Sequence, residues 1–336
     1  MKQSKTVLKV SIENYSKISY SWIRAVEFIK KRNYIIQEGI SVGGDAPKEF
    51  IKVYEYGRVK RNPSRKWIAY IAKVGHKWYP IESITEYLLN QIGEVLGLNI
   101  AKSRLAILGD QLFFLSEYFL NHKQYELVHG VDIYSGYIND KELVEEIEKK
   151  ALAREFFTFQ FAEKAIQEAF PEHANDLLAA FVKMLFFDAI VGNNDRHFYN
   201  WAVLRHIENA ISPTFSPIFD TARGLFWNQS EPKVMERYRH HNTLDEFIVK
   251  YAEKSMPKTG WEGQTELNHF QLVEMLVGYS PVYADILCML TNQNRENDVI
   301  TLIDTKFVTL LSKERRHLIN KCLHYRFQKL RSFLNR

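Results

Sequence analysis

The spacing of the apolar residues changes at about residue 120 of the 336-residue sequence, and this change limits the folds open to the chain more than any other feature. Before it, short apolar runs lie between Gly, Pro and Asn residues and predict strands. These strands are expected at 50–54, 66–74, 103–108 and 111–117. An amphipathic helix followed by a strand is expected within 17–37, and another helix, closed by Gly97, around 84–96.

After residue 120 the apolar residues recur at helical spacing. Helices are expected at 140–170, 174–191, 265–279, 281–292, 297–311 and 313–335. Two short strands are expected at 201–204 and 214–219, around a polar segment. The sequence therefore predicts an α+β fold of two lobes, with a β-rich N-terminal lobe at 1–120, a mostly helical C-terminal lobe at 121–336 and a cleft between them.

Composition excludes several classes of protein. The two cysteines, Cys288 and Cys322, exclude a disulfide-rich scaffold and any CxxC zinc or redox pair. The sequence contains no run of about 18 consecutive apolar residues, the length that a membrane span requires. We therefore expect a cytoplasmic protein, unless a specialised secretion system recognises another signal.

The formal charge of +5 is concentrated at the C-terminal end, where residues 313–336 hold eight Lys or Arg and one acidic residue. A helix with this many cations can bind phosphates or an acidic partner. Alternatively, its apolar side, which includes Leu318 and Cys322, docks on the protein while the cations face solvent. We favour docking, and direct nucleic-acid binding is not expected.

The densest polar cluster, Gly192-Asn-Asn-Asp-Arg-His-Phe-Tyr-Asn200, follows the apolar helix 174–191. Gly, Asn and Asp are also ordinary turn residues. However, Asp195 and Asn200 have the spacing by which kinase catalytic loops place an acceptor for the substrate proton and a magnesium ligand. A further carboxylate, Asp220, follows the strand at 214–219. Two Asp and one Asn supply the hard oxygen ligands that Mg²⁺ requires.

The first 120 residues hold the other parts that phosphoryl transfer needs. The segment 39–48 is a Gly-rich turn between two strands, and its backbone N–H groups can approach phosphates closely. Lys73 ends an apolar strand and is a candidate to contact the α- and β-phosphates, unless it faces solvent. Glu86, early on the next helix, is placed to orient Lys73 by an ion pair, unless it simply favours the helix N-terminus.

Together these parts resemble the HipA-like serine/threonine kinases of bacterial toxin–antitoxin systems. Ile40-Ser-Val-Gly-Gly-Asp-Ala-Pro-Lys48 is similar to the family's S-V-x-G-x-x-x-K phosphate loop, and Phe114-Leu-Ser-Glu-Tyr-Phe119 to its hinge. The segments 85–87 and 96–102 resemble its N-E-Y and A-L-G-L-N-V-A motifs. The most specific matches are 192–200 with G-N-x-D-x-H-x-x-N and 217–220 with P-x-Y-D.

The resemblance implies a bilobal protein-kinase-like fold, with ATP and Mg²⁺ as cofactors. It implies that Asp195 orients or deprotonates the attacking hydroxyl, that Asn200 and Asp220 hold Mg²⁺, and that His197 supports the loop. Arg196 would be a phosphate contact or a surface residue. The implied ATP-binding residues are Ser41, Val42, Gly43, Gly44, Lys73, Glu86, Glu117, Tyr118 and Phe119. Ser41 is also the candidate for autophosphorylation, which would repel the nucleotide phosphates.

The implied substrate is a protein, such as an aminoacyl-tRNA synthetase or another translation factor, and the implied partner is an antitoxin. Two departures from the family pattern limit what the resemblance implies about substrate and partner. Only 38 residues precede Gly39, so we expect a short, HipT-like form whose N-terminal subdomain is a separate protein or absent. Asp45-Ala-Pro47 and Phe219 also replace commoner residues of the family motifs.

Two alternatives stay open. The Asp-Arg-His-x-x-Asn string at 195–200 is also similar to the catalytic loop of phosphoinositide kinases, which leaves a lipid or small-molecule kinase as a rival. The Gly-rich loop favours a protein kinase. A non-catalytic binding protein, or pseudokinase, is disfavoured because Lys73, Asp195, Asn200 and Asp220 are all present.

Overall fold

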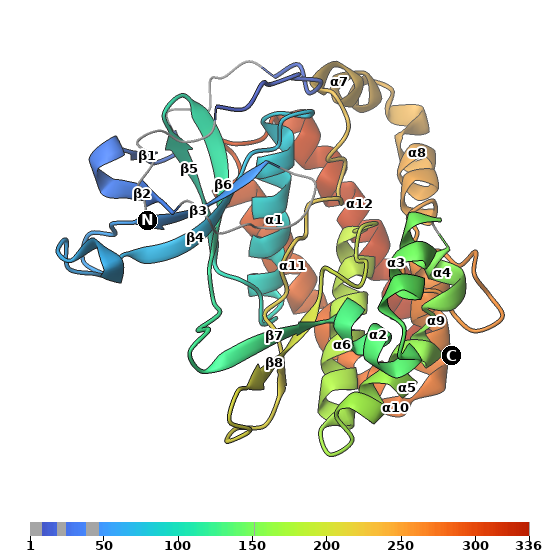
Figure 1. The fold of residues 1–336 in the computed structure, drawn as a ribbon. Helices are drawn as coiled ribbons and strands as arrows, with labels where there is room; N and C mark the ends of the chain where they lie inside the picture. Colours follow the sequence, from blue (N-terminus) through green and yellow to red (C-terminus); the bar gives the residue numbers. More distant parts are fainter. Residues whose placement is uncertain (1–8, 19–24, 38–46, 151, 336) are drawn as a thin grey trace.

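The structure is a computed structural model that describes residues 9–18, 25–37, 47–150 and 152–335. A six-stranded sheet dominates the N-terminal lobe (Figure 1). Its strands lie in the order β1-β5-β6-β4-β3-β2, with β1 parallel to β5 and the other neighbours antiparallel. The strands are β1 (Phe28–Ile29), β2 (Tyr34–Ile36), β3 (Lys48–Val53), β4 (Ile68–Lys73), β5 (Ser103–Leu108) and β6 (Gln111–Glu117), with 3₁₀ turns at Lys31–Asn33 and Ser64–Lys66.

Helix α1 (Ile81–Val95) packs on this sheet against β5 and β6. Its apolar residues Ile84, Leu88 and Ile92 are at most 1% exposed. The helix ends at Val95 with Leu96 as its C-cap, and Gly97 follows with φ +75°, a backbone conformation that glycine adopts at no steric cost. The sequence therefore predicted this helix and its end correctly.

The C-terminal lobe is built around α6 (Ala174–Val191), whose largely apolar residues are buried on nearly all sides. A second sheet, β7-β8-β9, lies between this lobe and the first sheet, and its strands are all antiparallel. Its strands are β7 (Tyr125–His129), β8 (Ala202–His206) and β9 (Thr214–Phe215). The surrounding helices are α2 (Gly130–Ile138), α3 (Lys141–Lys149), α4 (Ala153–Phe156), α5 (Phe159–Ala169), α7 (Glu231–Arg239), α8 (His241–Glu253), α9 (His269–Tyr279) and α10 (Pro281–Thr291).

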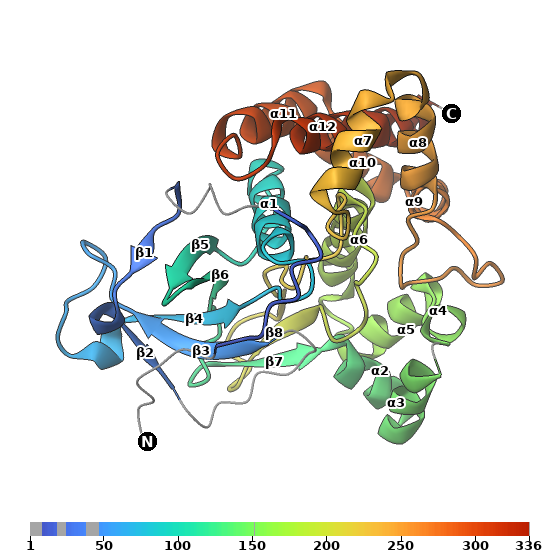
Figure 2. The same cartoon turned by 90° about the horizontal axis from the view of Figure 1, so that it is seen from above.

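The last two α-helices, α11 (Gln293–Lys306) and α12 (Lys313–Ser332), join the lobes, and a 3₁₀ turn at Phe333–Asn335 follows them. Seen from above, α11 lies beside α1 (Figure 2). Arg295 of α11 donates from Nη1 to the carbonyl of Val95 over 2.6 Å, and the rings of Phe307 and Tyr87 are 5.6 Å apart. The C-terminal part of the chain therefore holds α1 in place on the N-terminal sheet.

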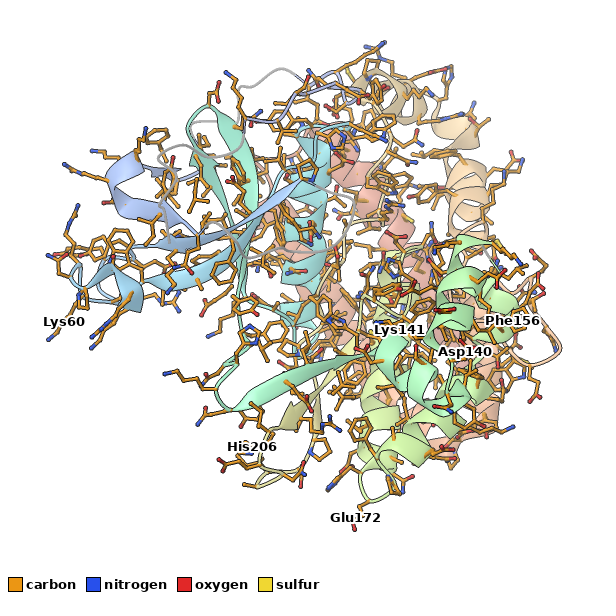
Figure 3. The ribbon with its side chains drawn as sticks, in the orientation of Figure 1. Lys60, Asp140, Lys141, Phe156, Glu172 and His206 are labelled. Carbon is orange, nitrogen blue, oxygen red and sulfur yellow. The ribbon has the colours of Figure 1, made fainter. Side chains whose placement is uncertain are left out.

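The C-terminal helix α12 docks by its apolar side, as favoured from the sequence, with Leu318 and Cys322 buried. The expectation that its cations face solvent is wrong for two of them. Arg315 and Arg326 are at most 1% exposed and donate to backbone carbonyls of the protein interior. Exposed charged side chains elsewhere, such as Lys60 and Glu172, point away from the body of the protein (Figure 3).

Two other predictions need correction. Over the described residues 25–37 there is no α-helix, only the 3₁₀ turn at Lys31–Asn33, because β1 pairs with β5, far along the chain. The strand expected after the helix is present as β2. The helix expected at 140–170 is three helices, α3, α4 and α5. Asp140 begins the first of them, and Thr158 begins the last by accepting a hydrogen bond from the N–H of Phe161. β7, α2, α7 and α8 were not predicted. None of the described helices is long and apolar enough to cross a membrane.

Candidate active site

A cavity of about 810 Å³ lies between the first sheet and the C-terminal lobe. It brings together most of the described residues singled out from the sequence. The lining includes Lys73, Glu86, Glu117, Tyr118, Phe119, Asp195, His197, Asn200 and Asp220. Ser41, Val42, Gly43 and Gly44 of the predicted phosphate loop lie outside the described residues, so their place in the site stays a prediction.

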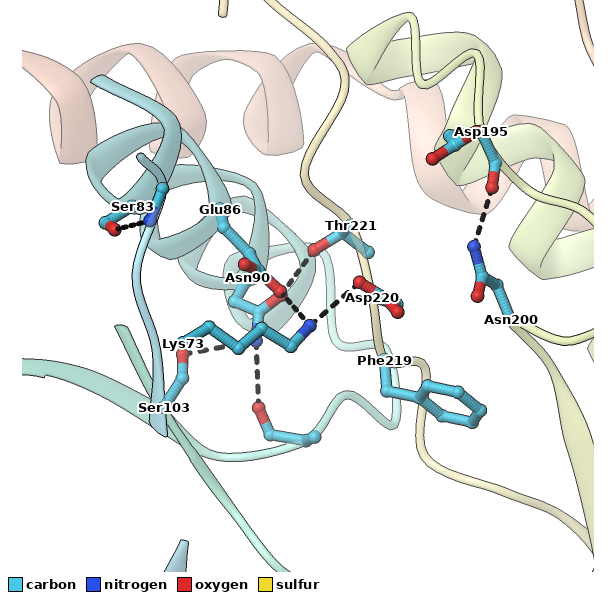
Figure 4. A network of polar contacts seen from close by, with 12 residues as sticks. Lys73, Ser83, Glu86, Asn90, Ser103, Asp195, Asn200, Phe219, Asp220 and Thr221 are labelled. Carbon is cyan, nitrogen blue, oxygen red and sulfur yellow. Dashed lines mark hydrogen bonds and ion pairs between the residues drawn. The ribbon is translucent and has the colours of Figure 1, made fainter. Parts of the chain in front are cut away.

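Lys73 ends β4 and is the centre of an ionic cluster in which Lys73 and Glu86 are buried and Asp220 is partly exposed (Figure 4). Its Nζ atom donates to Oε1 of Glu86 over 2.7 Å and to Oδ1 of Asp220 over 2.8 Å. The Lys73 side chain is 10% exposed and that of Glu86 is 7% exposed. The ion pair that the sequence suggested between Lys73 and Glu86 is therefore present, and Lys73 does not face solvent.

Burial and charge act in opposite directions on this cluster. Burial disfavours the charged form of Lys73, but Asp220 and Glu86 outweigh that effect and raise the pKa of Lys73. Burial likewise opposes ionisation of Asp220, but Lys73 outweighs it and holds the pKa of that carboxyl well below its usual range. For Glu86, burial dominates and raises the pKa. Lys73 and Asp220 are therefore both charged at neutral pH.

Thr221, the residue after Asp220, is held by a network of uncharged hydrogen bonds. The Thr221 hydroxyl donates to Oδ1 of Asn90 over 2.6 Å, and Nδ2 of Asn90 donates to the carbonyl of Ala101 over 3.1 Å. Asn90 lies four residues after Glu86, on the same face of α1 (Figure 4). Sequence analysis missed Asn90 and Thr221, although the spacing of Glu86 and Asn90 was a usable signal.

The loop after α6 presents Asp195 and Asn200 to the cavity. Gly192 ends α6 with φ +67°, and the side chain of Arg326 lies so close that a Cβ atom there would clash with it. Asn200 donates from Nδ2 to the backbone carbonyl of Asp195 over 2.7 Å (Figure 4). This bond uses neither the carboxylate of Asp195 nor the amide oxygen of Asn200, so both groups can bind other partners.

Arg196 is neither a phosphate contact nor a surface residue, which corrects both readings made from the sequence. It is 3% exposed, and its Nε atom lies 2.9 Å from Oδ2 of the buried Asp188 on α6. Its Nη1 atom also donates to the carbonyls of Asn200, over 2.8 Å, and Phe219, over 2.6 Å. Arg196 therefore ties the loop that holds Asn200 to the segment that leads into Asp220.

His197 contacts its own loop. Its Nε2 atom lies 3.2 Å from Nδ2 of Asn200, and its Nδ1 atom lies 3.3 Å from the backbone nitrogen of Tyr199. Burial lowers the pKa of His197, which keeps the imidazole neutral at pH 7. These contacts are those of a side chain that supports the loop.

At the predicted hinge, two backbone amides already have partners. Glu117 donates to the carbonyl of Lys102 over 2.7 Å, and Tyr118 donates to that of Ala69 over 2.9 Å. Phe119 follows, with its ring 6.2 Å from that of Phe219 across the cavity. If this segment binds a base, the backbone N–H groups of Glu117 and Tyr118 are therefore not its donors, and the rings of Phe119 and Phe219 offer apolar surface.

The donor set fits a magnesium ion. Asp220 and Asn200 both line the cavity and supply hard oxygen atoms, and the cluster at Asp220 carries two carboxylates for one lysine. Asp220 has φ +57°, a left-handed conformation that is uncommon outside glycine. Within the described residues, no group of three or more His, Cys, Asp or Glu side chains is placed to bind a metal ion. The set therefore suits a metal whose remaining ligands are water and phosphate oxygens.

Arg223 is a third site residue that sequence analysis missed. Its Nε atom lies 3.1 Å from Oδ2 of Asp195, and its guanidinium lies 5.5 Å from the ring centroid of Trp227. Both Arg223 and Trp227 line the cavity. The sequence carried one signal, a basic residue three positions after Asp220, which is too common a feature to single out.

Comparison with solved structures identifies a similar fold. CtkA, a proinflammatory kinase of Helicobacter pylori, matches with a TM-score of 0.69 at 19% sequence identity, over 89% of this chain and 93% of CtkA. HipA of Shewanella oneidensis MR-1, solved in a toxin–antitoxin complex with HipB and operator DNA, matches with a TM-score of 0.49 at 15% identity, over 88% of this chain and 64% of HipA. The likeness to CtkA confirms the predicted fold class, a kinase-like arrangement of a β-rich and a helical lobe.

Sequence comparison identifies the family. No curated protein matches the chain. The family model of the HipA-like C-terminal domain matches residues 40–273, most of the chain, and this range includes Lys73, Asp195 and Asp220. The chain therefore belongs to the HipA-like family.

Proposed function

We propose that the protein is an ATP- and Mg²⁺-dependent serine/threonine protein kinase of HipA type. One observation carries the proposal. Lys73 pairs with both Glu86 and Asp220 in the cavity that Asp195 and Asn200 also line. Phosphoryl transfer needs a fixed cation for the phosphates, oxygen ligands for magnesium and an acceptor for the hydroxyl proton, and these residues are of those kinds.

Each residue would have a separate task. Lys73, which Glu86 orients, binds the α- and β-phosphates. Asn200 and Asp220 would hold Mg²⁺, which when bound neutralises charge on the phosphates. Asp195 orients the substrate hydroxyl and accepts its proton at a carboxylate oxygen. Arg196 keeps the two motifs at a constant separation, because it bonds to the backbone of both.

The finer parts of the proposal rest on the family resemblance. We propose that the protein acts in the cytoplasm as a toxin. Its substrate would be a protein that serves translation, such as an aminoacyl-tRNA synthetase, and its partner an antitoxin. Autophosphorylation at Ser41 is part of the same proposal. A phosphate at Ser41 would add negative charge to the predicted phosphate loop and so disfavour ATP.

The test is intact mass and phosphopeptide mapping after incubation with ATP and Mg²⁺. Wild type is compared with Asp195→Asn and Asp220→Asn, and with Asp110→Asn as a matched control. Asp110 lies in the β5–β6 turn, is 68% exposed and pairs with Lys9 outside the cavity. We expect phosphate on wild type and on the control, with Ser41 among the sites, and none on the two folded site variants.

Other outcomes separate the alternatives. Wild type that binds ATP but phosphorylates only inositol lipids or small molecules would support the lipid or small-molecule kinase. Wild type that binds ATP without transfer to any acceptor would support a pseudokinase. Absence of nucleotide binding, measured by calorimetry with Mg²⁺ present, would overturn the proposal.

A further inference from the structure

Arg223 is held at the cavity by its backbone, while its side chain keeps freedom to move. The carbonyl of Arg223 accepts a hydrogen bond of 3.2 Å from the N–H of Asn194, next to Asp195. The side chain is 44% exposed and contacts the carboxylate of Asp195 and the ring of Trp227. The guanidinium can therefore change partners within the cavity without a change in the backbone.

The cations of the cavity come from two walls. Lys48 and Lys73 lie opposite each other in the register of β3 and β4, on the N-terminal sheet. Arg223 is the one Lys or Arg that the described C-terminal lobe adds to the lining. Its charge also reaches α1: burial raises the pKa of Glu82, and the charge of Arg223 adds to the backbone hydrogen bond from Trp78 and the charge of His76, which oppose that rise. Arg223 therefore supplies positive charge from the side opposite Lys73.

His197, two residues after Asp195, is turned toward its own loop. Its ring nitrogens lie 3.2 Å from Nδ2 of Asn200 and 3.3 Å from the backbone nitrogen of Tyr199. A phosphoryl group that approaches Asp195 carries negative charge toward a carboxylate, which is unfavourable unless a cation lies between them. Arg223 is the cation in contact with Asp195.

We propose that Arg223 is a catalytic residue that contacts the transferred phosphoryl group, an inference that rests on the proposed kinase function. In the transfer, the substrate hydroxyl oxygen forms a bond to the γ-phosphorus and its proton passes to Asp195. The bond from that phosphorus to the bridging oxygen breaks, and ADP leaves with this oxygen. Protonation removes the charge of Asp195, so Arg223 loses its counter-ion and its charge becomes available to the phosphoryl oxygens.

The test compares Arg223→Met with Arg205→Met. Arg205 on β8 is a matched control, because it is 49% exposed and pairs through Nε with Glu126, outside the cavity. We expect the Arg223 variant to lose about 100-fold in kcat, the effect typical of removing one donor to a developing charge. Arg223→Lys should recover part of that loss, and the control should match wild type.

Binding measurements separate a phosphoryl contact from a structural role. A contact to the γ-phosphate predicts that Arg223→Met weakens a non-hydrolysable ATP analogue about tenfold, as a lost charge-assisted hydrogen bond does, and leaves ADP affinity unchanged. The same loss is expected when the substitution is made in an Asp195→Asn background, where the carboxylate no longer needs neutralising. Circular dichroism and thermal unfolding of each variant establish that it is folded.

Three results would overturn the inference. The first is full kinase activity in Arg223→Met. The second is an equal loss of affinity for ADP and for the ATP analogue. The third is an unchanged affinity for the analogue when Arg223→Met is made in the Asp195→Asn background. Each of these presupposes an active or ATP-binding wild type. Failure of the kinase proposal itself is a different result, because wild type would then neither bind ATP nor transfer phosphate.

Discussion

The Nζ atom of Lys73 lies 2.8 Å from Oδ1 of Asp220, although the two residues are 147 positions apart in the chain. This ion pair connects the N-terminal sheet to the segment that follows β9 in the C-terminal lobe. Because Glu86 shares the same ammonium group, a change in any of the three residues alters the charge balance of the whole cluster.

Substitution of Lys73 by Met is expected to reduce phosphoryl transfer at least about 100-fold and to weaken both ATP and ADP, because the α- and β-phosphates lose their cation. Glu86→Gln is expected to cost less, about tenfold in kcat, since Asp220 still pairs with Lys73. Steady-state kinetics and calorimetry measure both effects. Lys60→Met, on the exposed connection between β3 and β4, is the control, and equal loss in the two Lys variants would contradict the assignment.

Substitution of Arg196 by Met is expected to destabilise the protein by about 3–5 kcal/mol, because Asp188 then remains buried without a counter-charge. Urea unfolding measures this difference. The double variant Asp188→Leu with Arg196→Met should be more stable than Arg196→Met alone, since no uncompensated charge remains. A loss below about 1 kcal/mol in the single variant would show that the pair does not hold the interior together.

Substitution of Arg315 by Met is expected to loosen residues 226–231. Arg315 donates to the carbonyls of Phe226 and Gln229 and pairs with Glu231 at 3.0 Å. Hydrogen–deuterium exchange in that segment should rise, because these groups lose a buried partner. Arg316→Met is the control on the same helix, since Arg316 pairs instead with the half-exposed Asp304. Unchanged exchange in the Arg315 variant would contradict the prediction.

The stability of the fold should fall in mild acid because of His269. Its Nε2 atom lies 3.1 Å from the carbonyl of Asn193, in the loop after α6, and burial, with the charge of Arg326, lowers the pKa of His269 to about 3. The unfolded chain takes up a proton near pH 6.5, whereas the folded protein does not until about pH 3. The stability that the neutral imidazole provides is therefore complete above pH 6.5 and is lost as the pH falls toward 3, by about 1.4 kcal/mol per pH unit.

His269→Gln tests this, because Gln keeps a donor for the carbonyl of Asn193 but does not titrate. Urea unfolding at pH 7.0, 6.0 and 5.0 should show the wild type losing stability faster than the variant. Parallel pH profiles for the two proteins would show that His269 is not the source of acid sensitivity.

Sequence alone located much of the fold and of the candidate site. The strands β5 and β6 and the helix α6 have the predicted bounds, because their spacing of apolar residues and their turn residues are local signals. The predicted pairing of Lys73 with Glu86 is present for a similar reason, since a strand end and the next helix leave few ways for these side chains to lie. The catalytic and cofactor roles of the site residues stay predictions.

Tertiary structure decided what depends on partners far along the chain. β1 is a strand because β5 offers its edge, although the local spacing suggests a helix there, whereas β2 is the strand expected at the end of 17–37 and pairs with β3. Arg196 and Arg326 are buried because Asp188 and backbone carbonyls of other elements satisfy them, which no count of charges in the sequence shows. In the same way, the contact between Arg223 and Asp195 follows from how the segment after Asp220 folds back on the loop after α6. Local spacing determines which elements form, whereas the pairing of charges requires the packed chain, because burial decides whether a charge needs a partner.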